Sequence, residues 1–229
     1  MMRKLLLILL CLPMIGFGQS WEKTFNHPLE SDEIGISVKQ TSDGGYILIV
    51  STDDTISNVR NIWLIKTNSF GDTLWTKLIA DCSIDNGGSV IQSLDGGYVI
   101  AAEGKWNSIP SIKIVKTNSI GDTLWTNRYF NTCCERMSSD IIQLVDSGYV
   151  ITGGVYNQKS KVPEASFLLK INSQGDSIWG KIYENTVVSD ELLNTVEQTT
   201  DGGYILNSEH KLIKTNSLGD TLWTKQYSG

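Results

Sequence analysis

Few residues in this chain combine the type and the spacing that catalysis or metal binding requires. His27 and His210 are solitary, and no second ligand stands at the spacing of a zinc site. Two histidines in unrelated segments also give a Ser-His-Asp or Cys-His nucleophile little basis. The sequence therefore predicts no metal site, no cofactor and no catalytic group of residues.

Acidic residues are the next candidates, and they gather between predicted strands. Asp53 and Asp54 belong to segment 52–61. Further acids lie in segments 30–33, 85–86 and 190–191. A Ca²⁺ ion needs six to eight oxygen ligands, and no Asp-x-Asp-x-Asp spacing is present, so solvated turn residues are the preferred interpretation. A glycosidase needs only two carboxyl groups a few ångströms apart, which residue type alone leaves open.

Two aromatic residues could take part in binding. Trp106 is the only tryptophan in a predicted loop, 103–111, and Tyr156 begins the corresponding loop of the next repeat, 156–166. An exposed indole can stack on a sugar or anchor a protein partner. The alternative is that the loop folds its own aromatic side chain onto the edge of the sheet.

The first 18 residues read as an export signal. Arg3 and Lys4 precede an apolar run that ends at Gly16-Phe17-Gly18, the small-x-small pattern of a cleavage site. Without these two basic residues, 17 of the 19 remain against 25 acidic ones, a net charge of −8. An acidic chain has no electrostatic footprint for nucleic acid, and no other run could span a membrane. We expect a secreted or cell-surface protein.

One hairpin sequence occurs four times, at 66–77, 116–127, 170–181 and 214–225. Asp-Gly-Gly-Tyr or Asp-Ser-Gly-Tyr also recurs, and each of its tyrosines follows a tryptophan by 23 to 25 residues. The tyrosines are Tyr46, Tyr98, Tyr149 and Tyr204, and the tryptophans are Trp21, Trp75, Trp125, Trp179 and Trp223. A period near 50 residues is typical of stacked supersecondary units.

Each unit reads as four short strands, A to D, because β-branched and aromatic residues alternate with turn signals every eight to ten positions. Such units are typical of β-propeller blades. The prediction is an all-β domain over 19–229 with four four-stranded antiparallel blades and one surplus N-terminal strand at 21–26. The blades are expected at about 34–79, 86–130, 137–183 and 192–227.

The turns carry the strongest local prediction. In the C–D turn Asn-Ser-x-Gly, the glycine is expected at positive φ after a type I turn; these glycines are Gly71, Gly121, Gly175 and Gly219. The third A–B turn has Ser147 where the other units have their first glycine. We therefore predict a type I turn in which Gly148 is left-handed.

The hairpin resembles quinoprotein-like propeller repeats, in which tryptophan follows glycine by four residues, as from Gly71 to Trp75. It is still more similar to the DGGY…GDxxW repeats of secreted bacterial propeller proteins, which often precede a type IX secretion sorting domain. The Asp-box of sialidase-type propellers spaces glycine and tryptophan by three and does not match. The resemblance covers residues 21–229. It implies that each repeat tryptophan packs between adjacent blades.

The strand count leaves ring closure open. Five D-type strands and four each of A, B and C permit four closed blades with an extra edge strand, or an open or partial ring. The A–B and C–D turns should lie on one face, and the longer, variable B–C and D–A loops on the other. Cys82 falls in one D–A loop, and the adjacent residues Cys133 and Cys134 fall in the D–A loop one blade further on. The expected disulfide is therefore Cys82–Cys133 or Cys82–Cys134.

The preferred hypothesis is a secreted, non-catalytic propeller module for binding, adhesion or scaffolding, with a glycan or protein partner. Function is expected on the face with variable loops, with Trp106, Tyr156, Asp53 and Asp54 as binding candidates. The alternative is a carbohydrate-active hydrolase or lyase that uses loop carboxylates.

Overall fold

The computed structural model describes residues 22–25, 33–54, 59–79, 88–106, 109–130, 134–157, 163–184, 193, 195–208 and 211–227. Some side chains at the strand ends, among them those of 53–54, 103–106 and 134–139, lie outside this description. The predicted signal, residues 1–18, lies outside it as well. The described residues contain no apolar helix of membrane-spanning length.

The described chain is built from strands that form four separate four-stranded antiparallel sheets. The first sheet contains β1 (Glu33–Gln40), β2 (Tyr46–Asp54), β3 (Val59–Thr67) and β4 (Thr73–Ile79). The second contains β5 (Gly88–Gln92), β6 (Tyr98–Trp106), β7 (Ile109–Thr117) and β8 (Thr123–Phe130). The third contains β9 (Cys134–Gln143), β10 (Tyr149–Asn157), β11 (Pro163–Ile171) and β12 (Ser177–Glu184). The fourth contains β13 (Thr195–Gln198), β14 (Tyr204–Asn207), β15 (Lys211–Thr215) and β16 (Thr221–Gln226).

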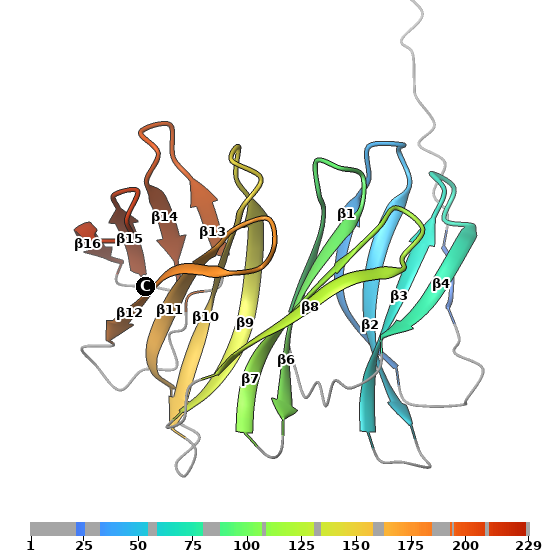
Figure 1. The fold of residues 1–229 in the computed structure, drawn as a ribbon, viewed down its shortest axis with the longest axis horizontal. Coiled ribbons are helices and arrows are strands. Elements are labelled where there is room, and N and C mark those ends of the chain that lie inside the picture. The colour runs from blue at the N-terminus through green and yellow to red at the C-terminus, as the bar shows by residue number, and fades with distance from the viewer. Residues whose placement is uncertain are drawn as a thin grey trace, which may run out of the picture.

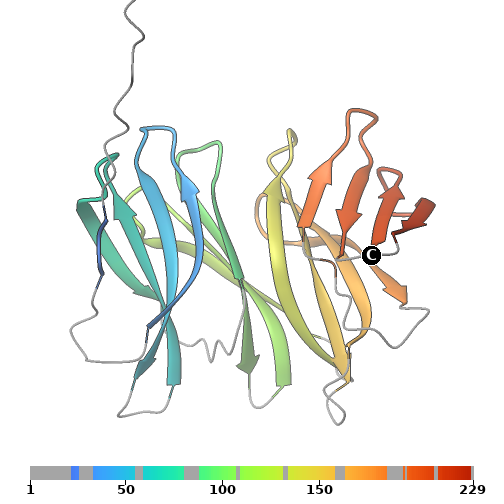
Figure 2. The same cartoon turned by 180° about the vertical axis from the view of Figure 1, so that it is seen from behind.

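The sheets stand side by side as the blades of a β-propeller (Figures 1 and 2). Within each sheet the strands pair in sequence order, and the first strands β1, β5, β9 and β13 contact one another in succession. Among the described elements, no comparable contact joins β1–β4 to β13–β16, so the four blades form an open arc. This confirms the all-β prediction of four antiparallel four-stranded blades.

The hydrophobic core lies between neighbouring blades. Ile47, Ile49 and Leu64 of the first sheet share one buried cluster with Val90 and Ile100 of the second. Equivalent clusters join the second sheet to the third and the third to the fourth. Alternating apolar residues therefore give the sheets apolar faces, and each face that meets a neighbouring blade is buried against it.

The A–B and C–D turns share one backbone conformation. In the A–B turn of the first unit, Gly44 N donates to Thr41 O, and Thr41 N donates to Gly45 O. The C–D turn has the same pattern, in which Gly71 N donates to Asn68 O and Asn68 N donates to Asp72 O. The C–D glycines have φ of 77°, 82°, 85° and 78°, as predicted for the left-handed position after a type I turn. Both kinds of turn lie at the same end of the blades (Figure 1).

The prediction for the third A–B turn was wrong in one respect. Ser147, and not Gly148, takes the left-handed conformation, with φ of 64°. A Cβ atom at the equivalent Gly96 would have nothing within 4 Å, so there is space for a side chain at this position. A non-glycine residue here has only the strain of the left-handed backbone conformation. At Gly148 a Cβ atom would lie 2.6 Å from the carbonyl oxygen of Ile171. The second glycine is required for close packing against strand C.

Substitution of the two glycines in one turn separates these effects. Gly96→Ala should cost about 1–2 kcal/mol of unfolding free energy, the strain of a left-handed non-glycine residue. Gly97→Ala should cost clearly more, because its Cβ atom would lie 2.1 Å from Thr117 O and 2.6 Å from Lys116 Nζ. Urea unfolding of the two variants tests this, and equal losses would contradict the packing argument.

Candidate functional site

Each seam between blades is organised by the tryptophan of one unit and the turn glycine of the next. The indole of Trp75 lies so close to Gly121 that a Cβ atom there would be 2.7 Å from it. The same approach, at 2.9 Å, occurs between Trp125 and Gly175. It occurs again, also at 2.9 Å, between Trp179 and Gly219. Only glycine leaves room for the indole at these positions, which explains why its place in the hairpin does not vary.

The indole also meets the tyrosine of the next unit. Trp75 and Tyr98 make an edge-to-face contact with ring centroids 5.7 Å apart, and Trp179 and Tyr204 do the same at 5.9 Å. Such pairs contribute about 0.5–1.5 kcal/mol beyond the burial of their area. Burial and the nearby Asp43 carboxylate raise the pKa of Tyr98 to about 12, so the phenol stays neutral.

An ion pair closes the seam on the exposed side. Lys77 Nζ lies 2.8 Å from Asp122 Oδ1, and Lys181 Nζ lies 2.7 Å from Asp220 Oδ1. In the middle seam, Asn127 replaces the lysine and donates to Gly175 O at 2.8 Å. The lysine hydrogen bond is the first cause of the lowered pKa of Asp122 and of Asp220. These pairs are exposed, so they set register more than stability.

The segment 22–25 occupies a fourth position of the same kind, in front of the first blade. Lys23 stands two residues after Trp21, as Lys77 does after Trp75, and its Nζ lies 2.8 Å from Asp72 Oδ1. Phe25 packs against the cluster of Val50, Trp63 and Ile65. The N-terminal segment thus docks on the first blade as a D strand would. Trp21 itself lies outside the described residues.

Trp75 and Trp223 form a matched pair for testing the seam. Trp75→Ala should lower the unfolding free energy by about 3 kcal/mol, since the indole packs on Tyr98 and Gly121. Trp223 is 41% exposed and touches no later unit in the described chain, so Trp223→Ala should change stability by about 0.5 kcal/mol or less. Urea unfolding measures both, and similar losses would show that the seam does not depend on the indole.

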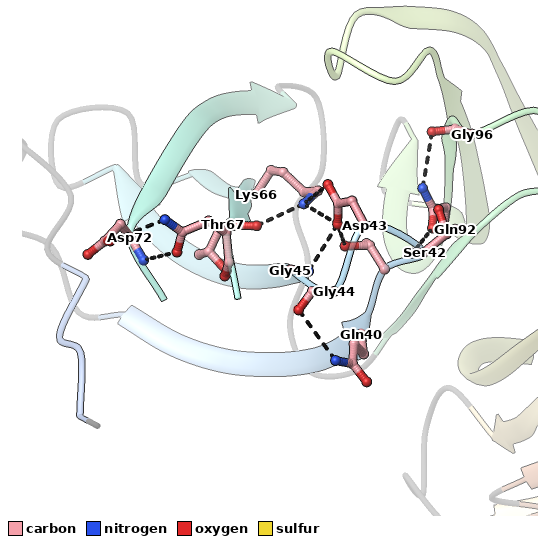
Figure 3. A network of polar contacts seen from close by, with 12 residues as sticks. Gln40, Ser42, Asp43, Gly44, Gly45, Lys66, Thr67, Asp72, Gln92 and Gly96 are labelled. Atoms are coloured by element: carbon pink, nitrogen blue, oxygen red, sulfur yellow. Dashed lines mark hydrogen bonds and ion pairs between the residues drawn. The ribbon is translucent and has the colours of Figure 1, made fainter. Parts of the chain in front are cut away.

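A second recurring contact ties each A–B turn to strand C. Figure 3 shows the Asp43 carboxylate between Lys66 Nζ, at 2.9 Å, and the N–H of Gly45, at 3.0 Å. Thr41 Oγ1 donates to the same carboxylate at 2.5 Å. The hydrogen bonds from Thr41, Lys66 and Gly45 lower the pKa of Asp43 to about 2. The Lys66 side chain is only 4% exposed, so the carboxylate is the counterion of a buried ammonium.

This contact predicts acid sensitivity. The folded-state pKa of Asp43 is about 2, below its ordinary 3.8, so its contribution is complete above the ordinary value and is lost as the pH falls toward 2. Asp43→Asn should therefore lower stability at pH 7 and flatten the decline between about pH 4 and pH 2. Unfolding free energies at several pH values test this. Parallel declines in the variant and the wild type would contradict it.

Among the described residues, all four blades line an open central cavity of about 500 Å³. Its walls are the ends of the first strands next to the A–B turns. Each strand contributes its last glutamine: Gln40, Gln92, Gln143 and Gln198. Lys39, Glu197 and Asp140 add charges, and Ile91, Ile141 and Ile142 add apolar surface. A polar cavity with a few apolar patches suits a hydrogen-bonding ligand.

Two of the glutamines are held by the preceding blade. Gln92 Oε1 accepts from Ser42 N at 2.7 Å, as Figure 3 shows, and Gln143 Oε1 accepts from Leu94 N at 2.7 Å. Gln198 is exposed within the wall, and its side chain makes no hydrogen bond to another described residue. The ring of amides is thus rigid on the side of blades two and three.

Asp140 is also held in place. Its Oδ1 accepts from Ile141 N at 2.9 Å and from Ser89 Oγ at 3.3 Å, and its Oδ2 accepts from Val196 N at 3.2 Å. This one carboxylate therefore links the first strands of blades two, three and four.

The four binding candidates from the sequence were expected in loops, but the structure places their backbone in strands. Trp106 and Tyr156 are strand residues, paired with Ile109 and Pro163. Asp53 and Asp54 are also in a strand, paired with Arg60 and Val59. The ladders extend further than the local turn signals indicated. The side chains of these four residues lie outside the described part, so their binding role stays a prediction.

The disulfide expectation also falls outside the description. Cys82 and Cys133 are not described, and Cys134 is described only as the backbone start of β9. The described residues contain no cluster of three or more histidine, cysteine or acidic side chains arranged to hold a metal ion.

The sequence prediction did not include the four glutamines, although they recur at one position of the repeat. A glutamine stands at the same place in all four A strands, before the turn residues, as in Lys39-Gln40-Thr41 and Glu197-Gln198-Thr199. A polar residue that recurs next to a tight turn resembles a turn-capping group in sequence. Only the side-by-side arrangement of the first strands shows that the four amides share one cavity.

Comparisons with known proteins support the fold. No family model and no curated protein match the sequence. Among solved structures, the chain is similar to the GH43_1 enzyme from Xanthomonas citri, crystallised with xylose, at a TM-score of 0.55 and 10% identity. The match covers 84% of this chain and 73% of that one. A protein of unknown function from Bacteroides caccae matches at a TM-score of 0.38 and 14% identity, over 87% and 84% of the two chains. The first likeness places the chain in the β-propeller fold class.

Proposed function

We propose that this protein is a secreted, non-catalytic propeller module that binds a glycan in its central cavity. The observation that carries the proposal is the ring of four glutamines with Lys39, Glu197 and Asp140 in one cavity. Amide and carboxylate groups offer donors and acceptors side by side, which is what neighbouring sugar hydroxyls require. The isoleucines among them suit the apolar C–H face of a sugar ring.

The cavity combines rigid and free polar groups. Gln92 and Gln143 are oriented by the backbone of the preceding turns, so part of the site is preorganised. Lys39, Glu197 and Gln198 are exposed in the wall and are the groups most available to a ligand. The xylose complex of the X. citri propeller adds support at the level of fold only.

The second candidate is the carbohydrate-active hydrolase considered from the sequence. The observation that favours it is that two carboxyl groups, Asp140 and Glu197, line the same cavity. A glycosidase needs one ionised carboxylate and one acid. Asp140 is held in place by three donated hydrogen bonds, and Glu197 is exposed in the wall of the same cavity.

Export and family membership belong to the same proposal. The N-terminal signal at 1–18 supports secretion, and the DGGY…GDxxW repeat supports a place among secreted bacterial propeller proteins that use type IX secretion.

A glycan array followed by calorimetry tests the proposal. The double variant Glu197→Gln with Gln198→Ala should lose at least about tenfold in affinity for any glycan that the wild type binds, since each lost hydrogen bond to a ligand is worth about 1 kcal/mol. Gln174→Ala, an exposed glutamine in a turn outside the cavity, should bind as the wild type does.

Release of reducing sugar from the bound glycan separates the two candidates. The binding module should release none. Turnover that disappears in Asp140→Asn and in Glu197→Gln would replace the binding proposal with the hydrolase. Affinity that does not change in the double variant would remove the cavity as the site.

A further inference from the structure

The outer face of β16 repeats a docking surface that is filled in the earlier blades. Trp223, Lys225 and Tyr227, here named the terminal docking face, have the spacing of Trp179, Lys181 and Tyr183. In β12, the indole packs on Gly219, Lys181 pairs with Asp220 at 2.7 Å, and the Tyr183 hydroxyl donates to Gly219 O at 2.8 Å.

The terminal docking face has no such neighbour in the described chain. Trp223 is 41% exposed and Tyr227 is 53% exposed. Lys225 Nζ lies over the Trp223 ring, 5.6 Å from its centroid. An exposed indole, ammonium and phenol in this order form an apolar patch with one positive charge.

The complementary surface stands at the other end of the arc. The C–D turn of the first blade, Asn68–Asp72 and here named the first receiver, has the Asn-Ser-x-Gly-Asp pattern of the three turns that accept a tryptophan. Asn68 Oδ1 accepts from Phe70 N and Asp72 N at 2.9 Å, which holds the turn in the same form as 216–220. The first receiver is contacted by Lys23 and not by a complete sheet.

We propose that the terminal docking face binds the first receiver of a second copy of this chain, and that the leading segment 22–25 is a cap that competes for this receiver. Lys225 would pair with the partner's carboxylate as Lys181 pairs with Asp220, and the indole would lie on the turn glycine. The contact continues an interface that the chain already forms three times, so shape and charge are matched. It is head-to-tail, and such contacts close into rings or extend into filaments.

At the first receiver, the described part of the cap contributes one ion pair, while Phe25 packs on the cluster of Val50, Trp63 and Ile65. Segment 22–25 forms no strand pairing within the described residues, and its ion pair with Asp72 is between side chains that are 41% and 56% exposed. An exposed pair of this kind contributes about 0.2–1 kcal/mol. The terminal docking face instead presents three side chains from a paired four-stranded sheet. The proposal is independent of glycan binding, because neither surface includes a residue of the cavity wall.

Sedimentation velocity and light scattering of the chain from residue 19, over a wide concentration range, test the inference. Lys23→Glu repels Asp72 and should release the cap, so its self-association should be about tenfold tighter than that of the wild type. Adding Trp223→Ala to Lys23→Glu should return the protein to a monomer. Because Trp223 is exposed, its replacement should leave the melting temperature unchanged.

A charge exchange identifies the two surfaces. Lys225→Glu and Asp72→Lys should each stay monomeric alone, since like charges would face each other at the contact. An equal mixture of the two variants should form a mixed assembly, because the introduced carboxylate of one and the introduced ammonium of the other restore the pair with opposite signs.

Any one of four outcomes would overturn the inference. Lys23→Glu could remain monomeric at every concentration, its association could survive Trp223→Ala, or the charge-exchanged mixture could fail to assemble. Burial of Trp223 in Lys23→Glu without an increase in mass would show that the ring closes within one chain.

Discussion

The whole structure depends on the contact of an indole with a glycine of the next hairpin. A repeat unit cannot bury its apolar faces alone, so it depends on the neighbouring units to cover them. The indole brings a large apolar surface to the seam, and the missing Cβ atom of Gly121, Gly175 or Gly219 lets it approach the backbone. The regular spacing of tryptophan and glycine in the sequence therefore sets a regular spacing of the blades, because each seam repeats the same contact between an indole and a turn glycine.

Polar contacts between lysine and aspartate set the register of the hairpins, which the contact between indole and glycine does not define alone. The buried lysine of strand C and the aspartate of the A–B turn hold the two hairpins of a blade together, as between Lys66 and Asp43. A buried ammonium without a partner would destabilise the fold, so the pair specifies the turn as much as it stabilises it. The lysine–aspartate pairs across the seams act in the same way from outside. Together they set the register that places four equivalent glutamines in one cavity.

Much of the fold could be predicted from sequence, because the decisive signals are local. A glycine at the fourth position of Asn-Ser-x-Gly requires only the conformation of a few residues, and its positive φ was predicted correctly. At Gly148, prediction from local backbone conformation fails. Its requirement comes from the carbonyl oxygen of Ile171, a residue on another strand, and local conformation pointed instead to a left-handed glycine. Strand ends were also misjudged, since pairing carries β2 to Asp54 and β6 to Trp106 beyond the predicted turns.

By itself, the sequence determined the repeat, its four strands, the turns and the tryptophan in each hairpin, because these depend on spacing and local backbone preference. It also determined the acidic charge and the signal-like N-terminus. Only the tertiary structure decided which tryptophan meets which glycine, that Asp140 links three blades and that the glutamines share a cavity. The physical reason is that these contacts join residues about 50 positions apart, and no local preference encodes the proximity of side chains that distant in the chain.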